Sequence, residues 1–232
     1  MNSGSTTPVV RAQGLARRYN DGRRIVEVFS GLDFTVSAGE SVSVIGDSGV
    51  GKSTLLHLLG GLDRPDDGQV FLQGHDVAAM KDADLARLRN AAVGFVFQFH
   101  HLLGDFTAEE NVMLPLMIGG ETRPQARARA AETLERMGLA DRLTHRPGEM
   151  SGGEQQRVAV ARALVGRPAV IMADEPTGNL DPDTAEAVHG LLVDVQKEAG
   201  CALVIVTHSA ALAALGDRTL RMEREGIVEI KS

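Results

Sequence analysis

Residues 46–54, GDSGVGKST, have the composition and spacing of a phosphate-binding loop. The loop follows an apolar run, SVSVI, and leads into KSTLLHLLGGL, which reads as a helix. Glycines let successive backbone N–H groups face a phosphate, and the helix start adds roughly half a positive charge. Lys52 would reach the β and γ phosphates of a nucleotide, and Ser53 would bind Mg²⁺. The residues expected to contact the nucleotide are Gly46, Ser48, Gly49, Gly51, Lys52, Ser53 and Thr54.

Two carboxylates, Asp174 and Glu175, end the apolar run AVIMADE. Asp174 is expected to reach the Mg²⁺ ion, commonly through water, and Glu175 to orient or deprotonate the attacking water. Two acids at the end of a strand also begin ordinary turns, so the pair alone leaves both interpretations open. Together with the phosphate loop, it favours nucleotide hydrolysis.

Residues 150–157, MSGGEQQR, form a second candidate anion site. Ser151, Gly152 and Gly153 stand at an expected helix start, where free backbone N–H groups attract a phosphate. An ordinary helix cap with flexible glycines would give the same three residues. The chain therefore carries two candidate phosphate-binding helix starts, roughly a hundred residues apart.

The pattern of apolar residues predicts an α/β fold. Short strands are expected between residues 9 and 44, including a hairpin, with a further strand at GQVFLQG. A helix over residues 81–90 and a strand at AVGFVFQ follow. Helix starts at Thr107, Thr122 and Ser151 predict a helical insertion from about residue 100 to 165. AVIMADE and ALVIVTH, on either side of a helical segment, have the composition of buried parallel strands.

Composition limits the partners. The 232 residues, 43% of them apolar, suffice for one sizeable core, and the net charge of -7 without a basic run argues against nucleic acid. A single cysteine, Cys201, excludes an internal disulfide and favours the cytoplasm. No apolar run approaches the ~18 residues that a membrane span needs. Any membrane role would come through another subunit, and residues 1–8, small and polar, are expected to be disordered.

The phosphate loop, Gln98, SGGEQQR, ADEPTGNLD and VTH, in this order, resemble the nucleotide-binding domain of an ABC transporter over essentially the whole chain. The resemblance implies two copies packed head to tail, with ATP and Mg²⁺ between the phosphate loop of one and the Ser-Gly-Gly helix of the other. It implies that Tyr19 stacks on adenine and that Gln98 touches Mg²⁺ and the attacking water. It also implies that Asp181 lies at the dimer seam and that His208 contacts the γ phosphate. A half-buried packing tyrosine and a strand-end histidine are the simpler interpretations of Tyr19 and His208.

Three positions depart from the family pattern. Met150 stands where leucine is usual, a change that conserves volume, and Glu154 where many members have glutamine. Ser209 follows His208 where aspartate is common, which leaves the tuning of that turn open. None of these changes removes an expected catalytic group, so an active ATPase is expected.

The adjacent pair His100 and His101 allows three interpretations. A metal site would need further ligands, and no cysteine lies near in sequence. A partly exposed polar pair is the simplest alternative. The third is a docking surface, because FQFHHLLGDFTAEENVMLPLMIGG is similar to the ATPase subunits of bacterial lipoprotein-releasing systems, the LolD family, apart from Gly104 and Phe97. In this interpretation Leu102, Leu103 and Phe106 are apolar contacts for a membrane subunit.

The expected protein is thus an α/β phosphate-loop ATPase of the ABC type, with a mainly parallel central sheet, an N-terminal antiparallel β subdomain and an inserted helical subdomain. Residues 1–99 and 166–232 would form the catalytic core and about 100–165 the helical subdomain. The resemblance implies partners in a second copy and in LolC/LolE-like integral membrane subunits. It implies a peripheral place on the cytoplasmic face of the inner membrane and the release of lipoproteins. A MacB-type export ATPase and an FtsE-type module that gates a cell-division complex are the alternatives.

Overall fold

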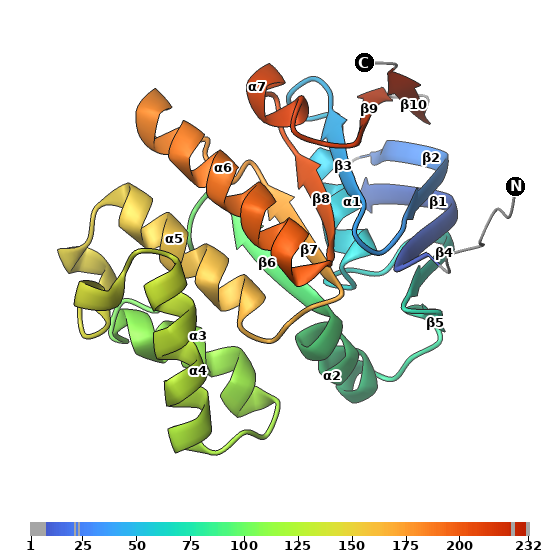
Figure 1. Cartoon of the computed structure of the whole chain (residues 1–232). Helices are drawn as coiled ribbons and strands as arrows, with labels where there is room; N and C mark the ends of the chain where they lie inside the picture. The colour runs from blue at the N-terminus through green and yellow to red at the C-terminus, as the bar shows by residue number, and fades with distance from the viewer. Residues whose placement is uncertain (1–7, 21, 23, 224–225, 231–232) are drawn as a thin grey trace, which may run out of the picture.

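The computed structural model describes residues 8–20, 22, 24–223 and 226–230. The disorder expected at residues 1–8 therefore concerns, apart from Pro8, a segment outside the described residues. Figure 1 shows a sheet with helices on both sides and a helical group at one end. In the part of the chain that the structure describes, no helix is both long and apolar enough to cross a membrane.

The larger sheet has six strands in the order β10-β9-β3-β8-β7-β6. Strands β3, β6, β7, β8 and β9 run parallel where they pair, and β10 pairs antiparallel with β9. These strands are β3 (Ser41–Ile45), β6 (Val93–Phe97), β7 (Val170–Asp174), β8 (Ala202–Val206), β9 (Arg218–Glu223) and β10 (Gly226–Ile230). The expected fold, an α/β protein with a mainly parallel central sheet, is confirmed.

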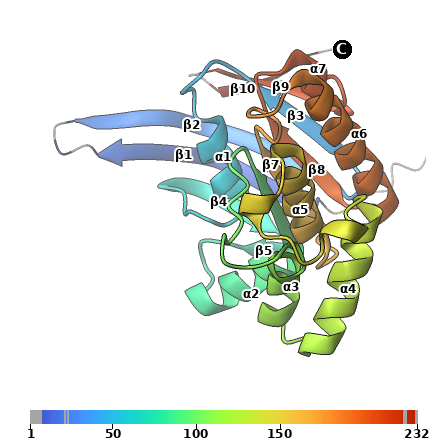
Figure 2. The ribbon, with the colours of Figure 1, turned by 90° about the vertical axis from the view of Figure 1, so that its left-hand side faces the viewer.

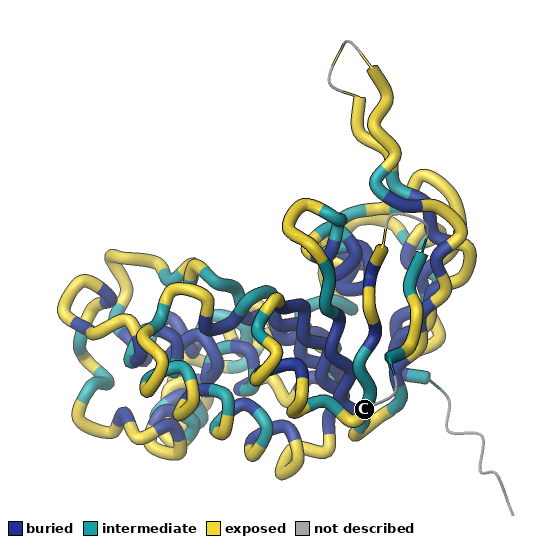
Figure 3. The backbone as a smooth tube through the Cα atoms, turned by 90° about the horizontal axis from the view of Figure 1, so that it is seen from above, coloured by how far each residue is buried: buried dark blue, intermediate teal, exposed yellow. Residues whose placement is uncertain are grey.

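A smaller antiparallel sheet, ordered β2-β1-β4-β5, confirms the expected N-terminal strand group. Its strands are β1 (Val10–Asn20), β2 (Ile25–Val36), β4 (Asp67–Leu72) and β5 (His75–Asp76). Strands β1 and β2 form a hairpin whose outer part stands away from the body (Figure 2). Figure 3 shows that this outer part is mostly exposed, while the base of the hairpin is buried.

The apolar alternation of the parallel strands creates two cores. In β7, Val170 and Met172 belong to one buried cluster, and Ile171 and Ala173 to the other. Successive side chains of a strand point to opposite faces, so the clusters lie on the two sides of the sheet. Helix α1 (Lys52–Leu59) contributes to the first cluster, whereas α5 (Gly152–Leu164) and α6 (Pro182–Ala199) contribute to the second. Helices α1 and α5 therefore cover opposite faces.

The helices expected between residues 100 and 165 are present as α3 (Ala108–Ile118), α4 (Arg123–Arg136) and α5, with two short 3₁₀ turns at Ala140–Arg142 and Pro147–Glu149. Thr107 and Ser151 cap α3 and α5, as predicted, and form capping boxes with Glu110 and Glu154. Each box satisfies backbone N–H groups that a helix start leaves free. Helices α2 (Asp82–Ala92) and α7 (Ala210–Ala213) complete the described helices.

Candidate nucleotide-hydrolysis site

The phosphate loop connects β3 to α1, as predicted. Gly51 caps α1 in the left-handed region, at φ 111°, and a Cβ there would meet Val28 Cγ1 at 2.4 Å. A Cβ at Gly46 would meet the Met222 carbonyl oxygen at 2.6 Å. At Gly51 the left-handed backbone and the neighbour on β2 both require glycine, and at Gly46 the close neighbour on β9 requires it.

Lys52 is held within this loop. Its Nζ donates to the carbonyl oxygens of Gly46, at 2.8 Å, and Asp47, at 3.0 Å, and the residue is only 8% exposed. A buried ammonium group needs such acceptors, because burial without them is costly. The same contacts hold the positive charge beside the N–H groups of the loop, where phosphate oxygens bind in a phosphate loop.

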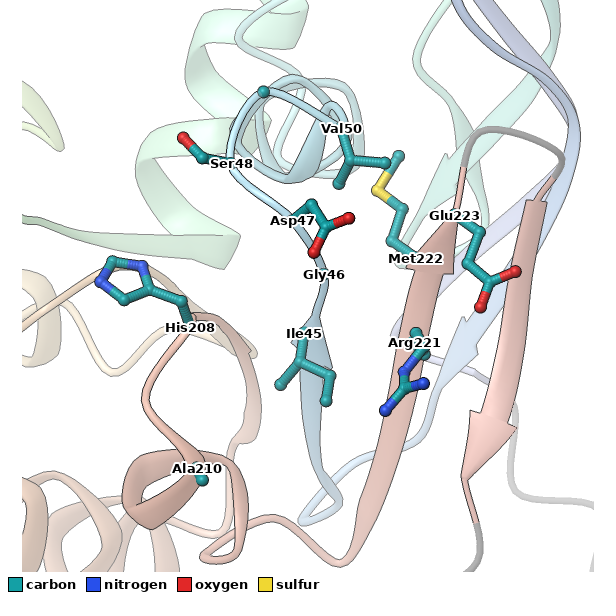
Figure 4. A pocket seen from close by; sticks show the side chains of 11 residues that line it. Ile45, Gly46, Asp47, Ser48, Val50, His208, Ala210, Arg221, Met222 and Glu223 are labelled. Atoms are coloured by element: carbon teal, nitrogen blue, oxygen red, sulfur yellow. The ribbon is translucent and has the colours of Figure 1, made fainter.

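A pocket opens beside the phosphate loop (Figure 4). Three segments line it: the end of β3 with the phosphate loop, the turn after β8 with the start of α7, and the end of β9. His208 lines the pocket from the second segment, across from the phosphate loop. The lining residues include Gly46, Asp47, Ser48, Gly49, His208 and Arg221.

Ser53 and Asp174 lie together, since Ser53 Oγ donates to Asp174 Oδ1 at 3.0 Å. Burial raises the pKa of Asp174, and the nearby Glu175 carboxylate adds to this effect, whereas the Ser53 hydrogen bond and the charges of His57 and Lys52 oppose it. The hydroxyl and carboxylate oxygens of these two residues are the ligand types that Mg²⁺ prefers. The charge of the ion would favour the ionised form of the Asp174 carboxylate. The residues present therefore fit the ion.

Glu175 is fixed by both of its carboxylate oxygens. Thr207 Oγ1 donates to Oε2 at 2.9 Å, and His208 Nδ1 lies 2.6 Å from Oε1. The backbone of Glu175 is left-handed, with φ 44°, while its N–H donates to the Val206 carbonyl at 2.9 Å. The Glu175 side chain is 13% exposed and that of His208 is 72% exposed. A mostly buried carboxylate is thus anchored beside an accessible imidazole.

Gln98 follows β6 and is paired with the loop after β7. Its Nε2 donates to Asn179 Oδ1 at 3.0 Å, and Asn179 Nδ2 donates to the Gln98 carbonyl at 3.2 Å. A Cβ at Gly178 would meet Gln98 Nε2 at 2.8 Å, so glycine allows this close approach. The carboxyl ends of β3, β6, β7 and β8 thus bring the phosphate loop, Gln98, Asp174, Glu175 and His208 to one edge of the sheet.

The Ser-Gly-Gly helix start lies elsewhere. Ser151 Oγ accepts from the Glu154 N–H at 3.3 Å, and Glu154 accepts from the Ser151 N–H at 2.8 Å and from Arg142 Nε at 2.8 Å. A Cβ at Gly153 would meet Thr184 Cγ2 at 2.4 Å, so this helix start packs on the start of α6. Ser151, Gly152 and Gly153 do not line the pocket beside the phosphate loop. Asp181 caps α6 by accepting from the Thr184 N–H at 3.1 Å.

Tyr19 lies on the outer part of β1, opposite Val26 of β2, and is 45% exposed. The guanidinium of Arg17 lies 4.8 Å from the centre of its ring. Because Val28 of the same hairpin approaches Gly51, the base of the hairpin lies beside the phosphate loop. The stacking of Tyr19 on adenine stays a prediction.

His100 and His101 do not form a metal site with other residues: among the described residues, no group of three or more histidines, cysteines or acids is placed to hold a metal. Arg162 of α5 instead donates to the carbonyl oxygens of His100 and His101, at 2.8 Å each. The ring of His101 packs edge-on against Phe97 at 5.3 Å. Burial lowers the pKa of His100, partly opposed by a contact with Gln155. The pair is part of a backbone turn that α5 holds in place.

Two neighbours of the site were not singled out from the sequence. Thr207 anchors Glu175, and Asn179 pairs with Gln98. The available signals were a polar residue at the end of the apolar run ALVIV and an asparagine in the turn after ADE. Neither signal indicates which partner the side chain contacts.

The fold and this set of residues define a phosphate-loop ATPase. The ABC transporter family model matches residues 29–178. The chain is 48% identical over 227 residues to the lipoprotein-releasing system ATP-binding protein LolD of Xylella fastidiosa, covering 98% of this chain and 95% of the relative. It is 53% identical over 214 residues to the protein of the same name from Geobacter metallireducens, covering 92% and 95%. The chain belongs to the ABC transporter family.

Solved structures agree with this assignment. The chain is similar to the ATP-binding cassette MJ0796, solved as a dimer in a post-hydrolysis state bound to ADP and Pi, with a TM-score of 0.87 and 35% identity. The similarity covers 96% of this chain and 99% of that one. The fold of an ABC ATPase, with its two sheets, is therefore shown along nearly the whole length.

Proposed function

We propose that this protein is the ATP-hydrolysing subunit of a transporter that releases lipoproteins from the inner membrane. The observation that carries the proposal is the identity of 48% and 53%, over nearly full length, to two proteins named as ATP-binding subunits of lipoprotein-releasing systems. The groups needed for hydrolysis are all present in this chain, which supports an active role. The resident metal would be Mg²⁺.

Two copies would enclose each ATP, with the phosphate loop of one copy facing the Ser151 helix start of the other. In support, α1 and α5 cover opposite faces of the sheet, and the Ser-Gly-Gly segment is not part of the pocket beside the phosphate loop. The similar cassette MJ0796 is itself a dimer. Asp181, at the start of α6, would lie at the seam between the copies.

Hydrolysis would use the groups gathered at the sheet edge. Lys52 and the loop N–H groups would bind the phosphates, and Tyr19 the adenine. Glu175 would accept a proton from the attacking water, with Thr207 and His208 holding its carboxylate in place. Ser53 and Asp174 would hold Mg²⁺, with Gln98 nearby, and the ion would neutralise charge on the phosphates. His208, whose ring is largely exposed, would contact the γ phosphate.

The segment after Gln98 would receive a helix of a LolC/LolE-like membrane subunit. Phe99 is 66% exposed and Ile118 is 72% exposed, and Leu103 and Phe106 are also exposed apolar residues. Ile118 lines a groove between α2, β6, α3 and α5. An exposed large apolar side chain at a groove, as at Ile118, is typical of a protein interface. This contact would place the protein peripherally on the cytoplasmic face of the inner membrane, with residues of about 100–165 acting as a helical subdomain.

The proposal is tested by measuring ATP hydrolysis by the protein purified with its co-expressed membrane partners in lipid, with and without an acylated lipoprotein. We expect ATP-dependent release of the lipoprotein, and no release by the Glu175→Gln variant. If Ile118→Ser loses the stimulation of ATP hydrolysis by lipoprotein, and an exposed control such as Val228→Ser keeps it, the docking surface is supported. Hydrolysis that is indifferent to lipoprotein would contradict the proposed substrate and leave export or cell-division roles.

A further inference from the structure

The loop from Glu175 to Asp181 joins the proposed catalytic carboxylate to the residue proposed for the dimer seam. It begins with the left-handed Glu175 and ends where Asp181 caps α6. Inside it, the Gly178 N–H donates to the Glu175 carbonyl at 3.0 Å, and the Leu180 N–H donates to the Thr177 carbonyl at 3.1 Å. The conformation of this loop therefore sets the positions of both acids relative to each other.

Side chains tether the middle of the loop on two sides. On one side, Asn179 is paired with Gln98. On the other, Thr177 Oγ1 lies 2.6 Å from Nε2 of His189, which belongs to α6, two turns after its cap. Thr177 is only 9% exposed, so its hydroxyl depends on a protein partner. His189 provides that partner.

The chemistry of His189 suits this contact. Burial lowers the pKa of its imidazole, partly opposed by Glu186, so the ring is neutral near pH 7. A neutral imidazole has one donor and one acceptor nitrogen, and a threonine hydroxyl can complement either. The 2.6 Å distance lies at the short end of the range for a hydrogen bond.

We propose that His189 is a positioning residue for ATP hydrolysis: through Thr177 it holds the loop that connects Glu175 with Asp181 in the conformation needed for turnover. The inference rests on the proposed function, and it adds a residue outside the nucleotide motifs. His189 is not among the residues that line the pocket beside the phosphate loop. Its effect would reach the reaction only through the loop.

The experiment compares steady-state ATP hydrolysis by the full chain carrying His189→Phe, His189→Gln, Thr177→Val or the double change His189→Phe with Thr177→Val. Phenylalanine keeps a ring without hydrogen bonding, and glutamine keeps a donor and an acceptor. Losing one hydrogen bond should lower kcat by roughly three- to tenfold in His189→Phe, with the KM for ATP nearly unchanged and the protein still folded at the assay temperature. Glutamine should restore most of kcat.

Thr177→Val should lower kcat by the same factor, and the double variant should lose no more than either single variant, because both changes remove one contact. The matched control is His75→Phe, the same substitution at an exposed histidine of β5, far in sequence from His189. If the wild type is active and both His189→Phe and Thr177→Val keep the wild-type kcat, the inference is overturned. Fully multiplicative losses of kcat in the double variant would also overturn it. A wild type no more active than Glu175→Gln would overturn the proposed function itself, and the inference with it.

Discussion

At the scale of single residues, the site depends on hydrogen bonds that fix side chains before any nucleotide binds. Lys52 is held by two loop carbonyls, and Glu175 by Thr207 and His208. Without these hydrogen bonds, each of these side chains would populate several rotamers. Fixing them in advance reduces the ordering that binding and hydrolysis require.

Glu154 shows how the Ser-Gly-Gly helix start is stabilised. The backbone N–H of Ser151, and then Arg142, lower the pKa of Glu154 to about 2. The unfolded chain binds a proton at the ordinary pKa near 4.5, so acid favours unfolding over this interval. The stabilisation by this carboxylate is thus fully present above about pH 4.5 and is lost as the pH falls toward 2.

We therefore expect Glu154→Gln to be less stable than the wild type at pH 7, and the difference to shrink as the pH is lowered from 5 toward 2.5. Urea unfolding of both proteins at a series of pH values measures this. Glu132→Gln, at an exposed position on α4, is the control. A difference in unfolding free energy that stays constant down to pH 3 would be inconsistent with the low pKa of Glu154.

At the scale of elements, β6 lies in close contact with the end of α5. A Cβ at Gly94 would lie 2.2 Å from the Ala163 carbonyl oxygen and 2.9 Å from its carbonyl carbon. Backbone atoms of a helix cannot turn away as a side chain can. Gly94→Ala should therefore destabilise the fold by about 1–3 kcal/mol.

Thermal or urea unfolding checks this value, with Gly148→Ala as the control, because a Cβ at Gly148 meets nothing within 4 Å. Equal stability of the two variants would show that β6 and α5 can separate at little cost.

Arg162 links α5, whose start carries Ser151, to the turn at His100 and His101. Its guanidinium donates to both carbonyls, and burial lowers its pKa. Lysine cannot span two carbonyls with the same fork geometry. Arg162→Lys should therefore raise the rate of amide hydrogen exchange in residues 99–106 severalfold, with little change in β8. Unchanged exchange in residues 99–106 would show that the two Arg162 hydrogen bonds do not hold this segment in place.

The sequence predicted those elements whose pattern is local. The phosphate loop, the capping boxes at Thr107 and Ser151, and the buried strands before Glu175 and His208 all have signals within a few residues. Strands β9 and β10 were not predicted, because RTLRME and GIVEI are short segments that gain their order by pairing with β3 and with each other. The two-residue β5 is too short for a pattern.

The same limit applies to the site. The types of the expected residues were readable, yet the left-handed backbone of Glu175 and the contact of Thr177 with His189 depend on elements that the fold brings together. Roles assigned to Gln98, Tyr19, Asp181 and His208 came from the resemblance and stay predictions. Their positions are compatible with those roles, because each is accessible or faces the shared edge of the sheet.

At the scale of the whole molecule, one chain would carry two complementary halves of the proposed nucleotide site. The phosphate loop and the Ser-Gly-Gly helix belong to helices on opposite faces of the sheet. Pairing two copies would complete two sites at once, because each contact in a two-fold symmetric dimer occurs twice. Opening and closing of the pair would then follow ATP binding and hydrolysis.

The central claim, hydrolysis by Glu175 within a paired site, is tested most directly with the full chain and its Glu175→Gln variant. Mass by light scattering and phosphate release would be measured with and without ATP and Mg²⁺. We predict that the variant forms a dimer only with ATP and releases phosphate at least a hundredfold more slowly than the wild type, on the order expected for loss of a general base. Phosphate release by Glu175→Gln at the wild-type rate would contradict the account.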